Sequence, residues 1–313
     1  MIAAPLAATA QTATTVRRIG VLSPETLPSQ AELQEDNAPL RALGWVEGKN
    51  LLVERRFANG RAELLRPFAE ELVRLKVEII VTLGTAATLA AKNATNTIPI
   101  VIWSAGDPVR SGLVASLARP GGNITGFSMV GPEIEAKRLA LLRELLPGLQ
   151  RLGVLENSKN PYFRAVRQEF EQACRSLGIQ PSFVEVAAAG ELESAIAEIA
   201  SQRAQALFVP RDSVFYDNRV QIVSAALRYA LPTIAAFKEM LEAGALVSYE
   251  QSIAEQDQRY AAFVDRILRG AKPADLPIEQ PTKFELVINL KTAKALGITV
   301  PQTLLLRADK VIQ

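Results

Sequence analysis

The sequence of 313 residues has no histidine and a single cysteine, Cys174. Without histidine, the chain cannot use Ser-His-Asp or Cys-His catalysis, and it lacks the commonest general base and the ligand of most zinc and iron sites. A single cysteine forms no disulfide within the chain. Its place in a helix-like stretch, residues 163–177, favours a small buried apolar residue over a nucleophile. We therefore expect no catalytic residue and no metal site.

Excess charge and long apolar runs are also missing. The 35 basic and 33 acidic residues leave a net charge of +2, and no Lys/Arg run is longer than two residues. A nucleic-acid partner is not expected, because its binding needs a clustered basic face. No run approaches the roughly 20 apolar residues of a membrane-spanning helix. The length fits two lobes of about 150 residues each.

The first residues resemble the end of a secretory signal peptide. Ala8 and Ala10 occupy the small positions that precede a cut, here ahead of Gln11. A full signal peptide begins with basic residues and has a longer apolar core, and neither is present. We interpret residues 1–16 as a signal-peptide remnant or as a disordered leader.

Strand-like apolar runs alternate with amphipathic runs along the rest of the chain, which is typical of parallel sheets covered by helices. A first series has strands at 18–22, 51–54, 78–83 and 99–102 and helices at 30–43, 62–75 and 86–92. After a Gly- and Pro-rich break at 118–128, a second series has helices at 133–146, 162–177, 192–201 and 214–229 and strands at 151–155, 183–186, 206–209, 233–236 and 246–249. A helix at 253–269, a strand at 284–289 and a short helix at 291–296 follow.

This alternation predicts an α/β fold of two Rossmann-like lobes, each a parallel sheet flanked by helices, joined by a hinge. We expect one lobe to contain residues 17–126 and 251–281 and the other residues 127–250 and 282–313. The chain then crosses between the lobes more than once.

Ligands of open α/β sheets bind outside the carboxyl ends of the strands, so the segments that follow the strands are the candidate site. These segments are 23–26, 84–86, 104–107, 157–160, 211–213 and 237–238. They are rich in small and hydrogen-bonding residues and poor in general bases, which favours binding over catalysis. Gly84 and Thr85 place the start of a helix where a carboxylate or phosphate fits, although Thr85 can simply cap that helix. Asn157 and Asn160 have the same ambiguity, since Asn before Pro161 is a normal helix start.

Two carboxylates follow strands. Asp107, in the stretch WSAGDPV, precedes Pro108 and can cap the turn through Val109 and Arg110. Asp212 can cap the helix that begins at Val214. If both face one cleft, they can act as an acid and base pair or receive an ammonium group.

Two phosphate-cofactor motifs are absent. Leu22-Ser23-Pro24-Glu25 stands where a dinucleotide fingerprint would follow the first strand, and no G-x-x-x-x-G-K-[ST] occurs. No cofactor is expected.

Five long stretches, residues 44–61, 89–101, 106–128, 242–252 and 267–312, resemble the ABC-transporter substrate-binding protein family of the tryptophan/tyrosine or uncharacterised-sugar uptake type. The resemblance implies a type I periplasmic-binding-protein fold with three crossings between the lobes. It also implies an extracytoplasmic, periplasmic protein that captures a small metabolite in its cleft and delivers it to an inner-membrane ABC permease. We expect this protein to be a monomer. An amino acid or aromatic carboxylate is the favoured solute.

Ser23, Thr85, Asp107, Asn157 and Asp212 match polar positions of the family pattern. The chain departs from it at 250–252, where members often have Gly-Pro-Asn, and at 235–238, where they often have Tyr-Gly-Phe-Arg. The full set of expected ligand-binding residues is Ser23, Thr26, Gly84, Thr85, Asp107, Phe127, Ser128, Asn157, Asn160, Asp212, Phe215, Phe237 and Ser248.

Two other classes are weighed against a solute-binding protein. An enzyme on the same fold would use Asp107 and Asp212 with Lys238 or Lys159. The effector core of a transcription regulator would need a DNA-binding domain, and the roughly 18 residues before the first strand are too few to form one.

Overall fold

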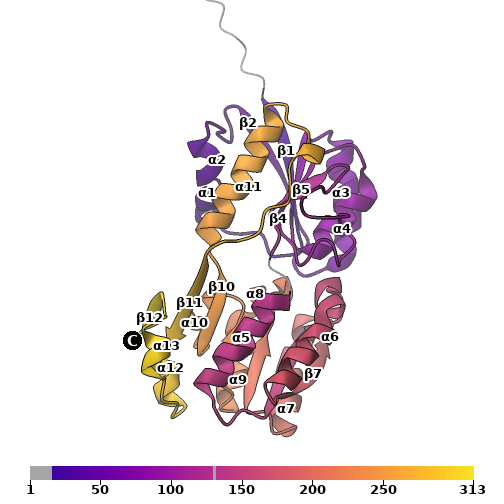
Figure 1. The fold of residues 1–313 in the computed structure, drawn as a ribbon. Coiled ribbons are helices and arrows are strands. Elements are labelled where there is room, and N and C mark those ends of the chain that lie inside the picture. Colours follow the sequence, from indigo (N-terminus) through magenta and orange to yellow (C-terminus); the bar gives the residue numbers. More distant parts are fainter. Residues whose placement is uncertain (1–15, 130–131) are drawn as a thin grey trace, which may run out of the picture.

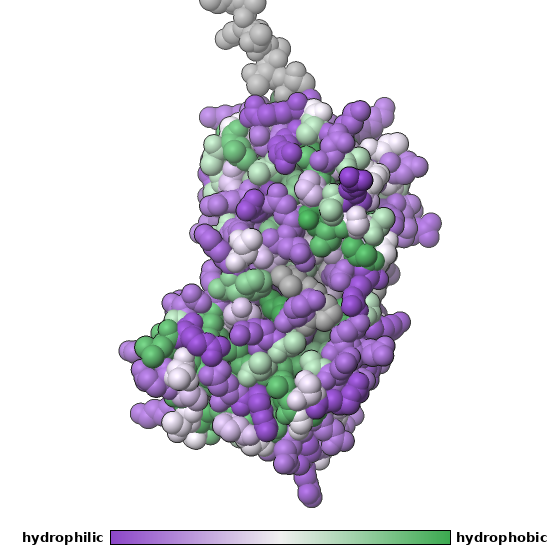
Figure 2. Space-filling view, in the orientation of Figure 1, coloured by the Kyte–Doolittle hydropathy of each residue, from purple (hydrophilic) through white to green (hydrophobic). Residues whose placement is uncertain are grey.

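Two lobes lie one above the other in the computed structural model, which describes residues 16–129 and 132–313 (Figure 1). Apart from Val16, the expected signal-peptide remnant falls outside the described residues. The space-filling view narrows between the lobes on its left side, and hydrophilic residues cover most of this face (Figure 2). None of the helices described is long and apolar enough to cross a membrane.

The first lobe contains a five-stranded, all-parallel sheet in the order β2-β1-β3-β4-β5. Its strands are β1 (Arg17–Ser23), β2 (Leu51–Phe57), β3 (Ile79–Leu83), β4 (Ile100–Ser104) and β5 (Ile124–Gly126). Its helices are α1 (Gln30–Asp36), α2 (Ala38–Ala42), α3 (Leu65–Arg74), α4 (Thr85–Ala94) and α11 (Ile253–Leu268), with short 3-10 turns η1 (Ala62–Leu64) and η3 (Pro273–Asp275). One apolar cluster joins α3 and α4 to the sheet and another joins α2 and α11 to it, so both faces are covered. Buried faces on both sides explain why β3 and β4 are almost continuously apolar.

The second lobe contains a seven-stranded sheet in the order β12-β11-β10-β9-β8-β6-β7. Its strands are β6 (Arg151–Asn157), β7 (Gln180–Val186), β8 (Ala206–Val209), β9 (Thr233–Ala235), β10 (Val247–Gln251), β11 (Phe284–Asn289) and β12 (Lys310–Ile312). Its helices are α5 (Pro132–Leu145), α6 (Pro161–Ser176), α7 (Leu192–Ser201), α8 (Ser213–Asp217), α9 (Arg219–Arg228), α10 (Glu239–Glu242), α12 (Leu290–Ala295) and α13 (Gln302–Leu305), with the turn η2 (Ala189–Glu191). The predicted α/β class with helix-flanked parallel sheets is confirmed.

One strand pair departs from the predicted parallel arrangement, because β10 and β11 are antiparallel. β10 runs toward the first lobe and continues into α11, and β11 returns from that lobe. A strand that leaves and a neighbour that comes back must run in opposite directions, whereas parallel neighbours need a crossover on the same lobe.

Two predicted helices are each broken in two. Asn37 ends α1, and Pro39 lies in the first turn of α2, where its missing N–H costs nothing. Asn218 in the same way separates α8 from α9. Apolar periodicity continues through both breaks, so the sequence pattern alone predicted single helices.

The chain passes between the lobes three times: between β5 and α5, between β10 and α11, and between η3 and β11 (Figure 1). The crossings are bonded to one another. Ser128 N donates to Glu279 O at 2.8 Å, and Ser252 N donates to Lys283 O at 3.0 Å. These three extended segments, which are linked to one another by backbone hydrogen bonds, form the hinge between the lobes.

Candidate functional site

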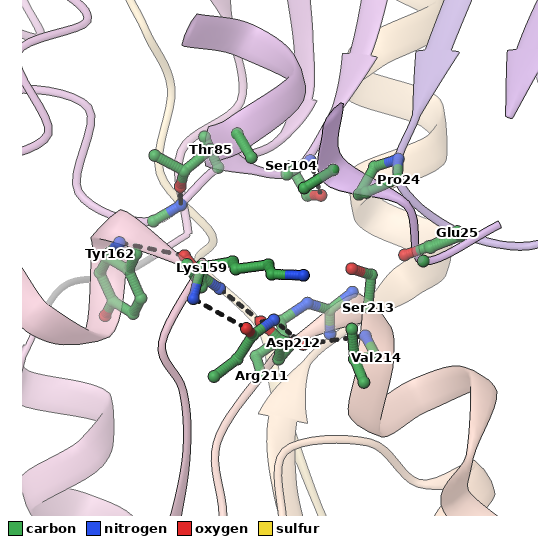
Figure 3. A pocket seen from close by; sticks show the side chains of 18 of the residues that line it. Pro24, Glu25, Thr85, Ser104, Lys159, Tyr162, Arg211, Asp212, Ser213 and Val214 are labelled. Atoms are coloured by element: carbon green, nitrogen blue, oxygen red, sulfur yellow. Dashed lines mark hydrogen bonds between the residues drawn. The ribbon is translucent and has the colours of Figure 1, made fainter. Parts of the chain in front are cut away.

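A cavity lies between the two lobes, at the carboxyl ends of strands from both sheets (Figure 3). Segments after β1, β2, β3 and β4 form the first-lobe wall, and segments after β6, β7, β8 and β9 form the second-lobe wall. The lining residues are Pro24, Glu25, Gly60, Ala62, Gly84, Thr85, Ala86, Ser104, Ala105, Gly106, Met129, Asn157, Lys159, Asn160, Tyr162, Ala187, Arg211, Asp212, Ser213, Val214 and Phe237.

The start of helix α4 forms part of the first-lobe wall. Gly84 precedes the helix with φ of 83°, a backbone conformation that favours glycine. Its N–H donates to Ser104 O at 2.7 Å, which ties the ends of β3 and β4 together. Thr85 Oγ1 accepts from Gly106 N at 3.1 Å. The N–H groups of Thr85 and Ala86 belong to the first helical turn and have no acceptor within the helix, so this wall attracts anions.

Asp212 connects two segments of the second-lobe wall, those that follow β6 and β8. Its Oδ1 accepts from Val214 N at 2.8 Å and caps α8. Asn157 Nδ2 lies 3.0 Å from both carboxylate oxygens, and Asn160 Nδ2 donates to Oδ2 at 2.7 Å. Burial raises the pKa of Asp212, and these hydrogen bonds oppose that rise. The hydrogen-bonding capacity of the Asp212 carboxylate is therefore largely used within the lobe.

Arg211 lies beneath the cavity in an ion pair with a buried acid. Its Nη1 is 3.5 Å from Glu250 Oε2, and its guanidinium lies 4.8 Å from the ring centroid of Phe237. Glu250 is 1% exposed, and its Oε1 accepts from Lys238 N at 2.8 Å. Burial raises the pKa of Glu250 to about 7, and the Arg211 charge limits the rise. Glu250 thus holds the Arg211 guanidinium at the lining of the cavity.

Glu25 and Lys159 enter the cavity from opposite lobes (Figure 3). Burial raises the pKa of Glu25 to about 7, while Arg211 opposes the rise. No ion pair or side-chain hydrogen bond engages either group among the described residues. The carboxylate of Glu25 and the amino group of Lys159 therefore face each other across the cavity, and neither has a side-chain partner among the described residues.

Six of the thirteen predicted ligand-binding residues line this cavity: Gly84, Thr85, Asn157, Asn160, Asp212 and Phe237. The structure does not bring the other polar ones into the lining. Ser23 Oγ accepts from Glu25 N at 3.1 Å. Asp107 Oδ1 accepts from Val109 N and Arg110 N, both at 3.0 Å, so Asp107 caps its own turn.

Thr26 instead connects the two lobes. Its N and Oγ1 donate to Asp217 Oδ2 at 3.0 and 2.9 Å. Ser128 Oγ donates to Met129 O at 2.6 Å in the hinge, and Ser248 is fully buried in β10.

Phe127 and Phe215 also lie outside the lining and are fully buried. Phe215 packs in the core beside β8 and α7. Burying these apolar side chains completely in the core stabilises the protein more than leaving them partly exposed in a cleft wall.

Sequence reasoning selected most of the segments that line this cavity but not all of its side chains. Glu25 and Arg211 lay inside the selected segments and carried no assigned role in binding. Met129 and Tyr162 lay outside them, in a hinge crossing and in the first turn of α6. No metal site arises in the described parts of the chain, where no three acidic or cysteine residues are grouped as ligands.

Two lobes that enclose a cavity at facing strand ends, joined by three crossings, define the class of periplasmic binding proteins. A family model described as "ABC transporter substrate binding protein" matches residues 33–312, and the chain belongs to this family. A "Tyrosine-binding protein" of Clostridioides difficile is 26% identical over 255 residues, which are 82% of this chain and 73% of the relative.

Solved structures give the same result. A conserved domain protein from Vibrio cholerae superposes with a TM-score of 0.89 at 26% identity, over 95% of this chain and 100% of that chain. A protein from Streptococcus pneumonia in complex with L-Trp superposes with a TM-score of 0.87 at 26% identity and the same coverage. The expected family is confirmed. The chain is a solute-binding protein of an ABC transporter, a kind of protein that works outside the cytoplasm with a small-molecule ligand and a membrane permease.

Proposed function

We propose that the solute is an amino acid or an aromatic carboxylate, bound between the lobes in the periplasm and released to an inner-membrane permease. The protein acts as a monomer, without a nucleic-acid partner and without changing the solute chemically. The observation that carries this proposal is the set of positive groups around the cavity: the first-turn N–H groups of α4, Lys159 and Arg211. Together they favour an anionic group.

The apolar part of such a solute has surfaces to contact. Phe237, Met129 and the ring of Tyr162 line the cavity, and the Tyr162 hydroxyl points away from it (Figure 3). A few charged groups with apolar walls are typical of small-molecule sites. The relatives named for tyrosine and solved with L-Trp support the same solute class.

Catalysis by the carboxylate pair weighed as the alternative has little geometric support. Asp107 faces its own turn rather than the cavity, and Asp212 is held by Asn157, Asn160 and Val214. Lys238 does not line the cavity. An acid and base pair must reach a common substrate, and Asp107 and Asp212 do not line one cavity.

A thermal-shift screen tests the solute class. The twenty L-amino acids, their deaminated acids and benzoate are each added to the purified protein at millimolar concentration. A ligand that binds only the native state raises Tm by mass action, so at least one member is expected to raise it by several degrees. If no member changes Tm, the proposed solute class is wrong.

A further inference from the structure

We propose that Glu25 receives an ammonium group of the solute and thereby makes the site select amino acids over carboxylic acids that lack one. This inference rests on the proposed function and narrows its solute class. It also assigns a binding role to a side chain that the family-based expectations left out.

Among the described residues, the carboxylates that line the cavity are those of Glu25 and Asp212. Asp212 already accepts from two asparagine side chains and a backbone N–H. Glu25 comes from the opposite lobe, and among the described residues its carboxylate has no ion-pair or side-chain hydrogen-bond partner. Glu25 is half-buried, so its carboxylate loses part of its hydration without gaining a partner, and a ligand cation offsets that cost.

The groups around Glu25 explain why a cation completes the site. Arg211 and Asp212 face it from the end of β8, Asp217 from α8 and Asp36 from α1, and Lys159 points toward it across the cavity (Figure 3). Arg211 is already paired with Glu250 at 3.5 Å, and no cation lies within ion-pair distance of Glu25 in the described structure. Burial and, to a smaller extent, the three neighbouring acids raise the pKa of Glu25, and an ammonium ion lowers it again.

Lys159 supplies the complementary charge from the other lobe. Its side chain lines the cavity, and no acidic partner holds it among the described residues. An amino acid placed with its carboxylate toward Lys159 or the start of α4 and its ammonium toward Glu25 contacts both lobes at once. A solute whose charged groups contact both walls binds the closed arrangement of the lobes better than the open one and so favours closure.

Calorimetric titration of three variants tests this assignment. Glu25→Gln keeps the size of the side chain and removes its charge, and Lys159→Gln does the same on the opposite wall. Glu35→Gln is the matched control, since Glu35 is an exposed acid of the same lobe that does not line the cavity. Each protein is titrated with the L-amino acids of the screen that bind the wild type and with the corresponding deaminated acids.

Glu25→Gln is expected to weaken binding of the amino acid by about 10- to 100-fold and to leave the affinity for its deaminated acid within about threefold. Lys159→Gln is expected to weaken both solutes, and Glu35→Gln neither. If the wild type binds deaminated acids as tightly as amino acids, or if Glu25→Gln weakens both equally, the assignment to Glu25 is wrong while the carboxylate site stands. If the wild type binds no member of either set, the proposed function fails as well.

Discussion

Gly106 of the first lobe lies directly against the ring of Tyr162 of the second. A Cβ added to Gly106 would be 1.9 Å from Tyr162 Cδ2 and 2.2 Å from Tyr162 Cγ. No other residue type fits there while the lobes keep this arrangement. The absence of a side chain at Gly106 is therefore a requirement of closure.

Gly106→Ala is expected to hold the lobes apart and to weaken solute binding by more than about tenfold, because closure then costs the energy of relieving the contact. The lobes themselves fold normally, since Gly106 does not have a left-handed φ. Calorimetry gives the affinity, and small-angle scattering gives the radius of gyration with and without solute. A Gly106→Ala variant that binds the solute and compacts like the wild type would contradict this expectation. Adding Tyr162→Ala to Gly106→Ala removes the ring that the new methyl group meets, and it should recover part of the affinity.

Two polar contacts hold the rims of the lobes together. Asp217 Oδ2 accepts from Thr26 N at 3.0 Å and from Thr26 Oγ1 at 2.9 Å, and Arg110 pairs with Glu169. Asp217→Ala should lower solute affinity by about fivefold, because exposed contacts of this kind contribute about 1 kcal/mol and affinity scales with the closed population. Glu169→Gln should lower it less, and its effect should disappear at high salt. Equal affinity of Asp217→Ala and the wild type would show that these contacts do not support closure.

Binding of an amino acid should depend on pH through Glu25. The pKa of Glu25 is raised to about 7, so the group is mostly protonated at pH 6 and mostly ionised at pH 8. An ammonium group is bound by the ionised form, so affinity should fall roughly tenfold from pH 8 to pH 6. Calorimetry at both values measures the change, and Glu25→Gln should remove it. A wild type whose affinity is the same at both values argues against a role of Glu25.

The buried pair of Arg211 and Glu250 should make the free energy of unfolding of the protein depend on pH. Arg211→Met leaves the Glu250 charge without its partner, which should lower the free energy of unfolding by about 3 kcal/mol at pH 8. The pKa of Glu250 is already raised to about 7, and losing Arg211 raises it further. A carboxyl group with a raised folded-state pKa destabilises the protein increasingly as pH rises from its unfolded pKa of 4.5 to its folded pKa. At pH 5.5 Glu250 stays mostly protonated with or without Arg211, so the loss caused by Arg211→Met should be smaller there than at pH 8.

Urea unfolding at the two pH values measures this difference. The double variant Arg211→Met, Glu250→Leu should regain most of the stability, because no buried charge remains. An equal loss at pH 5.5 and pH 8 would mean that Arg211 contributes by packing on Phe237 rather than by charge.

The periodicity of the sequence predicted the strands and helices whose stability comes from local apolar faces. β8 has the predicted bounds, residues 206–209, and β1 differs by one residue at each end. β5 and β12 were not predicted, and each is a three-residue strand at the edge of its sheet that pairs on one side only. Short edge strands carry too little pattern of their own.

The site was predictable at the level of segments, because strand ends of parallel sheets converge. Side-chain direction was not predictable. Asp107 and Glu25 both follow strands, yet Asp107 turns back to Val109 and Arg110 while Glu25 enters the cavity. Tyr162 contacts the opposite lobe through a glycine, and no pattern within one lobe contains that information.

Filling the cavity between the lobes tests most directly whether the solute binds there. Ala86 lines the cavity in the first turn of α4, so Ala86→Trp places a bulky side chain there. Gln34→Trp adds the same ring at an exposed position of α1 outside the lining.

The measurement is calorimetric titration of both variants with a solute that binds the wild type. We expect Ala86→Trp to lose binding by at least about 100-fold, while Gln34→Trp binds like the wild type. Unchanged binding by a folded Ala86→Trp protein would place the solute elsewhere and contradict the account.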